Sequence, residues 1–162
     1  MNDKEAERLV NTYSDMISKI CYTYLKSMTE VEDICQNVFL KLICHQLKFH
    51  SLEHEKAWVI RTTINMCKDY LKSAWIKRVI PLEEKAHSYV EQMEEDDKFL
   101  LSMVMKLKRE YRLSIYLYYY ENYTMKEIAS LLNKSENAVY LYLSRGRKKL
   151  QKLLNQYEQE GI

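Results

Sequence analysis

Glycine and proline are almost absent from this chain, and their scarcity limits the possible folds more than any other feature. Two glycines and one proline occur among 162 residues. Tight hairpins depend on glycine, and proline interrupts regular structure, so long sheets are improbable and an all-α chain is expected. Hydrophobic residues make up 47% of the chain and charged residues 30%, which is enough apolar side chain for buried cores.

Charge is distributed unevenly along the chain. Residues 1–80 carry a net charge of +2 and residues 99–162 a net charge of +5, whereas residues 81–98 carry a net charge of −5. An acidic segment between two neutral or basic blocks predicts two small helical domains joined by a linker. We place the first domain at 1–76, the acidic linker at 77–98 and the second domain at 99–162.

The cysteines and histidines do not predict a metal site. The four cysteines contain no CxxC pair and fall within apolar helical patterns, so we expect buried free thiols in a reducing compartment. They are Cys21, Cys35, Cys44 and Cys67. His50 and His54 have the spacing of a metal-binding pair on a helix, but no second closely spaced pair accompanies them. We therefore expect no metal and no cofactor.

The C-terminal part of the chain predicts two helices joined by a tight turn. Thr124 followed by Glu127 forms a capping box, so a helix is expected to begin at Met125. Asn133 tolerates the left-handed conformation that ends a helix, and Ser135 can cap the next one. Two helices separated by about three residues predict a helix-turn-helix unit.

The second helix of this unit has an apolar row and a polar, basic face. Side chains recurring at steps of four and three predict its buried row, which comprises Val139, Leu143, Gly146, Leu150 and Leu153. The candidate DNA contacts on the other side are Asn137, Tyr140, Leu141, Ser144, Arg145 and Lys148. Side chains near the start of such a helix can reach base edges, and later Arg and Lys can bind phosphates. A solvated face on an ordinary helical pair is the alternative.

Residues 107–123, just before this unit, are expected to form one strongly apolar helix. It contains Tyr116, Tyr118, Tyr119 and Tyr120. A cluster of tyrosines can stack on bases, but a small domain needs large side chains for its core. We therefore expect most of these rings to pack inside the domain.

In the N-terminal block, residues 31–43 predict a helix with two different faces. The expected buried row comprises Val31, Cys35, Val38 and Leu42, and the far side carries Asp33, Gln36 and Leu40. An exposed leucine framed by polar side chains suits a protein partner. A single leucine on a surface is also common in proteins without such a partner.

Residues 57–73 predict another two-faced helix. Its apolar stripe comprises Ile60, Ile64, Cys67 and Leu71, and the opposite face carries Trp58, Arg61, Asn65, Asp69 and Lys72. An aromatic ring, two cations and an amide offer stacking, phosphate neutralisation and base-edge hydrogen bonds, which single-stranded nucleic acid requires. The alternative is that Trp58 folds back onto its neighbours and the remaining side chains are solvated.

The order of these motifs resembles a bacterial RNA polymerase sigma factor of the extracytoplasmic-function (ECF) group, which keeps only the domains called regions two and four. EDICQNVFLKL resembles the region-two helix that docks on the polymerase, and WVIRTTINMCKDYLKS resembles the promoter-melting helix. Residues 107–150 resemble region four without a gap. The resemblance covers about residues 8–75 and 99–154.

This resemblance implies a role for each face. Asp33, Gln36 and Leu40 would contact core RNA polymerase. The face from Trp58 to Lys72 would bind the non-template strand of the minus-10 element, and the second helix of the C-terminal unit would read the minus-35 element of promoter DNA. The acidic linker would follow the RNA-exit path of the polymerase, although a flexible tether explains its composition equally well. The family also implies an anti-sigma partner.

The chain departs from the family pattern at three places, one of which is Lys108 in place of a turn proline. Tyr140, Leu141 and Tyr142 stand where family members usually carry Lys, Ser and Arg, so the minus-35 contact is expected to be weaker or differently specific. Asn122 and Asn133 stand in place of glycines, and asparagine tolerates the same backbone region.

The function predicted from these features is that of a sigma factor, without enzymatic activity of its own. The sequence shows no glycine-rich phosphate loop and no cluster of residues typical of a catalytic site. No apolar run approaches the roughly 20 residues of a membrane span, so a cytoplasmic location is expected. Two alternatives remain: a stand-alone helix-turn-helix regulator with an N-terminal dimerisation or sensing domain, and a helical adaptor that binds only proteins. A palindromic duplex site would favour the first, and DNA binding insensitive to salt the second.

Overall fold

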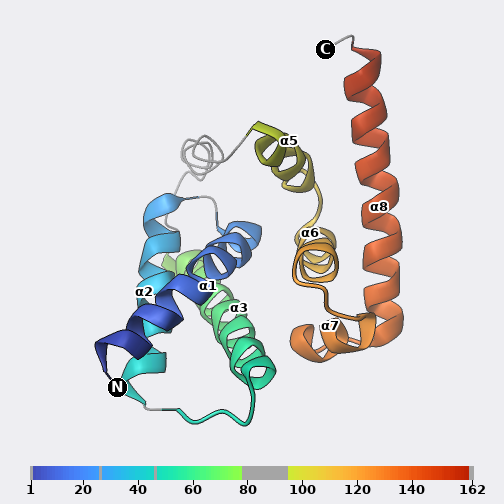
Figure 1. The fold of residues 1–162 in the computed structure, drawn as a ribbon. Helices are drawn as coiled ribbons and strands as arrows, with labels where there is room; N and C mark the ends of the chain where they lie inside the picture. The colour runs from blue at the N-terminus through green and yellow to red at the C-terminus, as the bar shows by residue number, and fades with distance from the viewer. Residues whose placement is uncertain (1, 26, 46, 78–94, 161–162) are drawn as a thin grey trace. The chain divides into compact units, whose positions relative to one another are not determined.

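The computed structural model describes residues 2–25, 27–45, 47–77 and 95–160, and over these residues it contains helices and no strand (Figure 1). The prediction of an all-α chain is therefore confirmed. The chain divides into two compact units, Met1–His87 and Ser88–Ile162. Most of the predicted linker, residues 78–94, lies outside the described residues, and α5 begins at Glu95. The domain limits given above stay a prediction.

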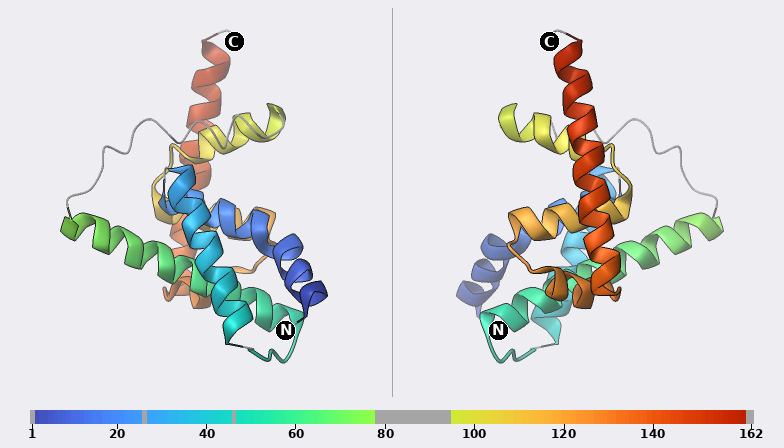
Figure 2. Two further views of the ribbon diagram at one scale, coloured as in Figure 1. Left: turned by 90° about the vertical axis from the view of Figure 1, so that its left-hand side faces the viewer. Right: turned by 90° about the vertical axis from the view of Figure 1, so that its right-hand side faces the viewer.

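Over its described residues, the first unit is a bundle of three helices that pack against one another in pairs (Figure 2). They are α1 (Asp3–Tyr24), α2 (Met28–Cys44) and α3 (Leu52–Lys77). The side chain of Asn2 accepts a hydrogen bond from the Glu5 amide at 2.8 Å and so caps the start of α1. Fully enclosed side chains from all three helices form the core, among them Ile17, Ile20, Val38, Ile60 and Ile64.

A buried carboxylate joins the beginning of α1 to the beginning of α3. Glu55 is 7% exposed, and its two oxygens accept hydrogen bonds from the two terminal nitrogens of Arg8 at 3.1 and 2.9 Å. The Tyr13 hydroxyl donates a third hydrogen bond to it at 2.7 Å. Because burying a charge costs free energy unless it is fully paired, these contacts fix the register of the two helices.

The described part of the second unit consists of four α-helices and one π-helical turn. These are α5 (Glu95–Val104), α6 (Arg109–Ile115), η1 (Tyr116–Tyr120), α7 (Met125–Leu132) and α8 (Glu136–Gln159). Figure 1 shows α8 as one long helix beside the others, and α5, α6 and α7 each pack on it. Leu113, Leu117, Ile128 and Leu143 are among the fully buried side chains of this core.

The predicted capping residues of the helix-turn-helix unit are confirmed. Thr124 accepts a hydrogen bond from the Glu127 amide, and the Glu127 side chain accepts one from the Thr124 amide, each at 3.2 Å. Ser135 accepts a hydrogen bond from the Ala138 amide at 3.1 Å and caps α8. Asn122 and Asn133 have φ angles of 60° and 56°, the left-handed conformation expected of residues that replace glycine.

The prediction for the tyrosine-rich segment is wrong in two respects. The continuous helix expected over 107–123 is instead α6 followed by the wider turn η1. Tyr116 is buried and Tyr118 half-buried, whereas Tyr119 and Tyr120 are 49% and 44% exposed. Consecutive residues of a helix point in directions about 100° apart, so neighbouring rings cannot all face one small core.

The prediction of four buried thiols holds for only two of them. All four cysteines are free; Cys21 and Cys67 are buried, Cys35 is half-buried, and Cys44 is exposed. Cys44 is the last residue of α2 and lies two positions beyond the buried Leu42. Two helical steps turn a side chain about 200° away, which explains its exposure.

Gly146 allows α6 and α8 to approach closely. A Cβ atom at this position would lie 2.8 Å from Cδ1 of Ile115 and 3.2 Å from Cβ of Tyr111. Both distances are shorter than ordinary van der Waals contact. A larger side chain therefore requires Ile115 to change position or the two helices to move apart.

Gly146→Val is expected to destabilise the second unit by about 1–3 kcal/mol, because overpacking forces side chains and backbone to move. Urea unfolding followed by far-UV circular dichroism would measure the loss. Gln151→Val introduces the same side chain at an exposed position of α8 and serves as the control. Equal losses in the two variants would show that the close approach of α6 and α8 does not depend on glycine.

Candidate nucleic-acid and polymerase interfaces

The exposed face of α2 comprises the side chains predicted to contact a protein. Asp33, Gln36 and Leu40 are all exposed, and Leu40 is 56% exposed despite being apolar. The buried side of the same helix contains Val31, Ile34, Val38 and Leu42, while Cys35 is half-buried. The predicted buried row did not include Ile34. The buried side of α2 is centred between positions 34 and 35, so both side chains face inward, with Ile34 buried and Cys35 half-buried.

The exposed face of α3 carries the polar and aromatic side chains predicted for single-stranded nucleic acid. Arg61, Asn65, Asp69 and Lys72 are exposed and Trp58 is half-buried. The opposite side of α3 packs into the first unit through Ile60, Ile64 and Cys67, with Val59 and Thr63 also enclosed. One helix therefore presents a continuous polar face with an aromatic ring near one end.

Trp58 belongs to a run of aromatic rings that sequence patterns did not predict. Its ring centroid lies 5.8 Å from that of Phe49, which precedes α3. The Phe49 ring meets His54 edge-on at 5.3 Å, and His54 stacks on His50 at 5.4 Å. Trp58 therefore packs partly on its neighbours and keeps part of its ring accessible. This lies between the two alternatives predicted from the sequence, a ring exposed for stacking on bases and a ring folded back onto its neighbours. No helical periodicity connects Phe49 to Trp58, because a loop separates them.

The first half of α8 presents the side chains predicted to read duplex DNA. Asn137, Tyr140, Arg145 and Lys148 are exposed, whereas Leu141 and Ser144 are half-buried. Tyr140 is 52% exposed and lies at the edge of this face. The predicted buried row is confirmed for Val139, Leu143 and Gly146, while Leu150 and Leu153 are half-buried. Amide, hydroxyl and cationic groups thus follow one another along the accessible side of α8.

Arg147 lies on the flank of α8 and is held in place by η1. Its Nε atom donates a hydrogen bond to the Leu143 carbonyl at 3.2 Å, and Nη1 donates to the Tyr119 hydroxyl at 3.0 Å. An arginine fixed by a neighbouring ring is less able to follow the DNA backbone than one that extends into solvent.

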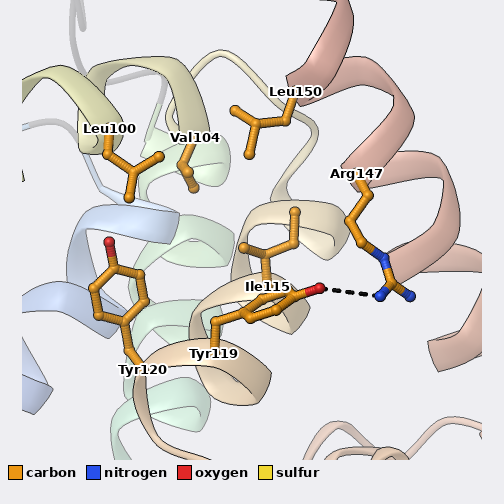
Figure 3. Close-up of a pocket in the computed structure, with 7 residues that line it drawn as sticks. All are labelled: Leu100, Val104, Ile115, Tyr119, Tyr120, Arg147 and Leu150. Atoms are coloured by element: carbon orange, nitrogen blue, oxygen red, sulfur yellow. Dashed lines mark hydrogen bonds between the residues drawn. The ribbon is translucent and has the colours of Figure 1, made fainter. Parts of the chain in front are cut away.

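Beside Arg147 the second unit has an apolar pocket of about 350 Å³ (Figure 3). Its lining residues are Leu100, Val104, Ile115, Tyr119, Tyr120, Arg147 and Leu150. The hydrogen bond between Tyr119 and Arg147 forms one polar edge of an otherwise hydrophobic hollow. The sequence did not predict this pocket, because Tyr119 and Tyr120 were assigned to the core.

The clearest pKa shifts among carboxyl and hydroxyl groups belong to contacts between helices of the first unit. Burial raises the pKa of Glu55, but hydrogen bonds from Arg8 and Tyr13 outweigh burial and leave that pKa below its ordinary value. Burial and a hydrogen bond to Glu30 raise the pKa of Tyr70 to about 12. These contacts join helices of the first unit, and Tyr70 also lies near Asp33 of the α2 face, whose negative charge contributes to the rise in the pKa of Tyr70.

The described residues contain no group of three or more His, Cys, Asp or Glu side chains placed to hold a metal ion. His50 and His54 stack on each other, and the His50 amide donates a hydrogen bond to Nδ1 of His54 at 3.2 Å. Within the same residues, no helix is both long enough and apolar enough to cross a membrane.

Comparison with known protein families gives two matches that together span most of the chain. A family model described as sigma-70 region 2 matches residues 9–76. A second model, described as sigma-70, region 4, matches residues 100–150. The exposed faces of α2 and α3 fall within the first match, and the first half of α8 falls within the second.

Two relatives support the same assignment. The ECF RNA polymerase sigma factor SigW of Bacillus subtilis (strain 168) is 25% identical, over 90% of this chain and 87% of its own length. The probable RNA polymerase sigma factor RfaY of Xanthomonas campestris pv. campestris is 26% identical over 86% of this chain. The match covers only 38% of RfaY, which is therefore a much longer protein.

Two solved structures share the fold. The sigma factor RpoE of Bartonella quintana, crystallised with the anti-sigma factor NepR, has a TM-score of 0.75 and 16% identity, covering 94% of this chain and 98% of RpoE. CnrH, solved with the cytosolic domain of CnrY, has a TM-score of 0.66 and 21% identity, covering 96% of this chain and 90% of CnrH. At these identities the likeness extends to the fold alone.

Proposed function

This chain belongs to the sigma-70 family and to its extracytoplasmic-function group, and from that premise we propose which of its surfaces perform the work of a sigma factor. As a sigma factor it binds core RNA polymerase, recognises promoter DNA and directs the initiation of transcription. The observation that carries the proposal is that three exposed faces, on α2, α3 and α8, lie within the segments matched by regions 2 and 4.

The face of α2 that docks on the polymerase comprises Asp33, Gln36 and Leu40. An exposed leucine gains free energy when a partner covers it, and the two polar side chains beside it set its orientation. All three point away from the packed side of α2, so the bundle keeps its core when this face is bound or mutated.

The paired variant Gln36→Ala and Leu40→Ala is expected to bind core RNA polymerase about ten-fold or more weakly, since truncating central interface residues commonly costs about 2 kcal/mol. Fluorescence anisotropy with labelled protein would measure the affinity, and circular dichroism would check the fold. Leu52→Ala removes another exposed leucine of the same unit and is the control. If the paired variant binds as well as this control, the α2 face is ordinary surface.

The face of α3 binds the non-template strand of the minus-10 element as the duplex opens. Trp58 offers a stacking surface, Arg61 and Lys72 neutralise phosphates, and Asn65 and Asp69 supply hydrogen bonds to base edges. This proposal is supported by the exposure of all four polar side chains and by the partly accessible ring of Trp58.

The first half of α8 reads the minus-35 element in the major groove. Asn137, Tyr140, Leu141 and Ser144 face the base edges, and Arg145 and Lys148 bind the backbone phosphates. Tyr140 and Leu141 supply apolar surface where a cation would add an ionic contact. Recognition is therefore expected to depend less on salt than it does in a family member with cations at these positions.

The partners of this chain follow from its family. They are core RNA polymerase, promoter DNA and an anti-sigma factor, since RpoE of Bartonella quintana was crystallised with such an inhibitor. The chain recognises the promoter while the polymerase catalyses RNA synthesis, so the chain is not itself an enzyme. It acts in the cytoplasm, where the polymerase works. The acidic segment is assigned to the RNA-exit path on composition alone, because residues 78–94 lie outside the described part of the chain.

Co-elution with core RNA polymerase in gel filtration tests the proposal directly. A sigma factor should co-elute with the polymerase and enable it to transcribe from a promoter. A folded chain that fails to co-elute, with no inhibitor attached, would instead favour the stand-alone helix-turn-helix regulator. The region 2 match over residues 9–76 argues against that regulator, because a separate dimerisation or sensing domain would not carry this motif.

A further inference from the structure

An apolar side chain lies at the centre of the polar face of α8. Successive residues of a helix point in directions about 100° apart, so the direction opposite the buried Val139, Leu143 and Gly146 falls between Leu141 and Lys148. Lys148 lies farther along the helix, which leaves Leu141 at the centre of this face within the first two turns. Leu141 is half-buried, so part of its side chain remains accessible.

The side chains around Leu141 are polar and can approach base edges. Asn137 is exposed one turn before it, and Ser144 and Arg145 follow about one turn after it. Four residues of a helix rise about 6 Å, and neighbouring bases of one strand are about 3.4 Å apart. Leu141 is therefore expected to contact a base pair one or two steps from the pair that Asn137 contacts.

The tyrosines on either side of Leu141 face in other directions. Tyr142 is half-buried, and its ring packs on Tyr111 of α6 with the two centroids 6.1 Å apart. Tyr140 is exposed but lies about 100° around the helix from Leu141, at the edge of the face. Of these three neighbouring residues, Leu141 is thus the one placed to meet a base edge in the middle of the groove.

We propose that Leu141 is a specificity-determining residue that recognises the 5-methyl group of a thymine in the minus-35 element, a role that rests on the proposed function of α8. In the major groove, thymine presents this methyl group beside an acceptor oxygen, whereas cytosine presents an amino donor. A leucine gains free energy when it covers a methyl group. It has no group that can accept a hydrogen bond from a cytosine amino group shielded from water, and an unsatisfied donor is costly.

The same chemistry explains what leucine changes relative to the family pattern. Family members usually carry serine at this position, and a serine hydroxyl can donate to or accept from several bases. Leucine can make only an apolar contact. The substitution therefore narrows the choice of base at one position of the minus-35 element, rather than only weakening the contact.

Selection from a pool of DNA duplexes tests this role. The full chain, assembled with core RNA polymerase, is presented with duplexes randomised over both promoter segments, and the bound duplexes are sequenced. Each thymine of the enriched upstream element is then replaced singly by deoxyuridine, which lacks the methyl group and keeps the other atoms of the base edge. Competition binding measures the affinity of each duplex. One replacement is expected to weaken binding about three- to ten-fold, the effect of losing one buried methyl group.

Variants of α8 show whether this loss depends on Leu141. Leu141→Ser should bind the thymine and deoxyuridine duplexes equally, whereas Leu141→Met keeps an apolar side chain and should keep the preference. Tyr140→Ala is the matched control, because it removes an exposed side chain from the edge of the same face and should leave the ratio of the two affinities unchanged. A general loss of stability lowers both affinities and does not alter their ratio.

Three results would overturn the role of Leu141 and leave the proposed function standing. They are an enriched upstream element without thymine, deoxyuridine replacements that all leave the affinity unchanged, and a loss as large in Leu141→Ser as in the wild-type chain. The last would show that the methyl group acts through the shape of the DNA. A polymerase complex that forms but enriches no upstream sequence would instead contradict the assignment of α8 to the minus-35 element, and the role of Leu141 with it.

Discussion

A variant carrying Trp58→Ala and Asn65→Ala is expected to bind core RNA polymerase normally and to open promoter DNA at least about ten-fold less efficiently, because each base stacked on an aromatic ring contributes about 1–3 kcal/mol. Neither side chain belongs to the enclosed core of the first unit, since Trp58 is half-buried and Asn65 exposed. The fold and the α2 face should therefore survive. Permanganate reactivity of promoter thymines would measure strand opening directly.

Trp58→Phe is the matched control for this experiment. It keeps an aromatic face beside Phe49, whose ring centroid lies 5.8 Å from that of Trp58. This variant should recover most of the permanganate reactivity that alanine removes. Reactivity unchanged in the double variant would contradict a role of α3 in melting, and a phenylalanine variant as inactive as alanine would contradict stacking as the cause.

Glu55→Ala is expected to destabilise the first unit by about 1–3 kcal/mol, because it leaves the buried Tyr13 hydroxyl without its hydrogen-bond acceptor. The variant would leave the Tyr13 hydroxyl and one side of the Arg8 guanidinium without their acceptor. Both tryptophans of the chain, Trp58 and Trp75, lie in the first unit, so urea unfolding followed by tryptophan fluorescence reports this unit alone.

Glu5→Ala provides the contrast. Glu5 pairs with the same arginine at 2.6 Å, but its side chain is 43% exposed, compared with 10% for Glu55. Exposed ion pairs contribute at most about 1 kcal/mol, so this variant should unfold at nearly the wild-type urea concentration. Equal losses in the two variants would show that burial of Glu55 does not determine its contribution.

The stability of the first unit should also fall in acid. The pKa of Glu55 in the folded chain lies below its ordinary value of 4.5. Between these two pKa values the unfolded chain binds the proton and the folded chain does not, so protonation favours unfolding. The contribution of Glu55 is therefore complete above about pH 4.5 and is lost as pH falls through the folded pKa. In Glu55→Ala this part of the acid dependence should disappear.

Features that depend on neighbouring residues could be predicted from the sequence. The caps at Thr124 and Ser135 and the left-handed Asn133 require only residues within about one helical turn, and all three occur as expected. The two-faced patterns of α2 and α3 also follow from local periodicity, which is set by the helix itself. The positions of the candidate site residues on exposed helix faces were therefore accessible without a structure.

Features that depend on contacts between distant segments could not be predicted in the same way. The pairing of Arg8 with Glu55 joins residues 47 positions apart, and the meeting of Cys21 with Cys67 joins residues 46 positions apart. No pattern in the sequence around any of these four residues predicts either contact. The change from α6 to η1 was also missed, since the apolar pattern of residues 107–123 fits one continuous helix.

The length of α8 has a mechanical consequence for the second unit. With 24 residues rising about 1.5 Å each, this helix forms a continuous rod about 36 Å long. Its first turns carry the face proposed to lie in the major groove, and near its far end Tyr157 packs on Phe99 of α5 with ring centroids 4.6 Å apart. A rod of this kind transmits a tilt at one end as a displacement at the other, so the angle at which α8 enters the groove also sets where α5 is held.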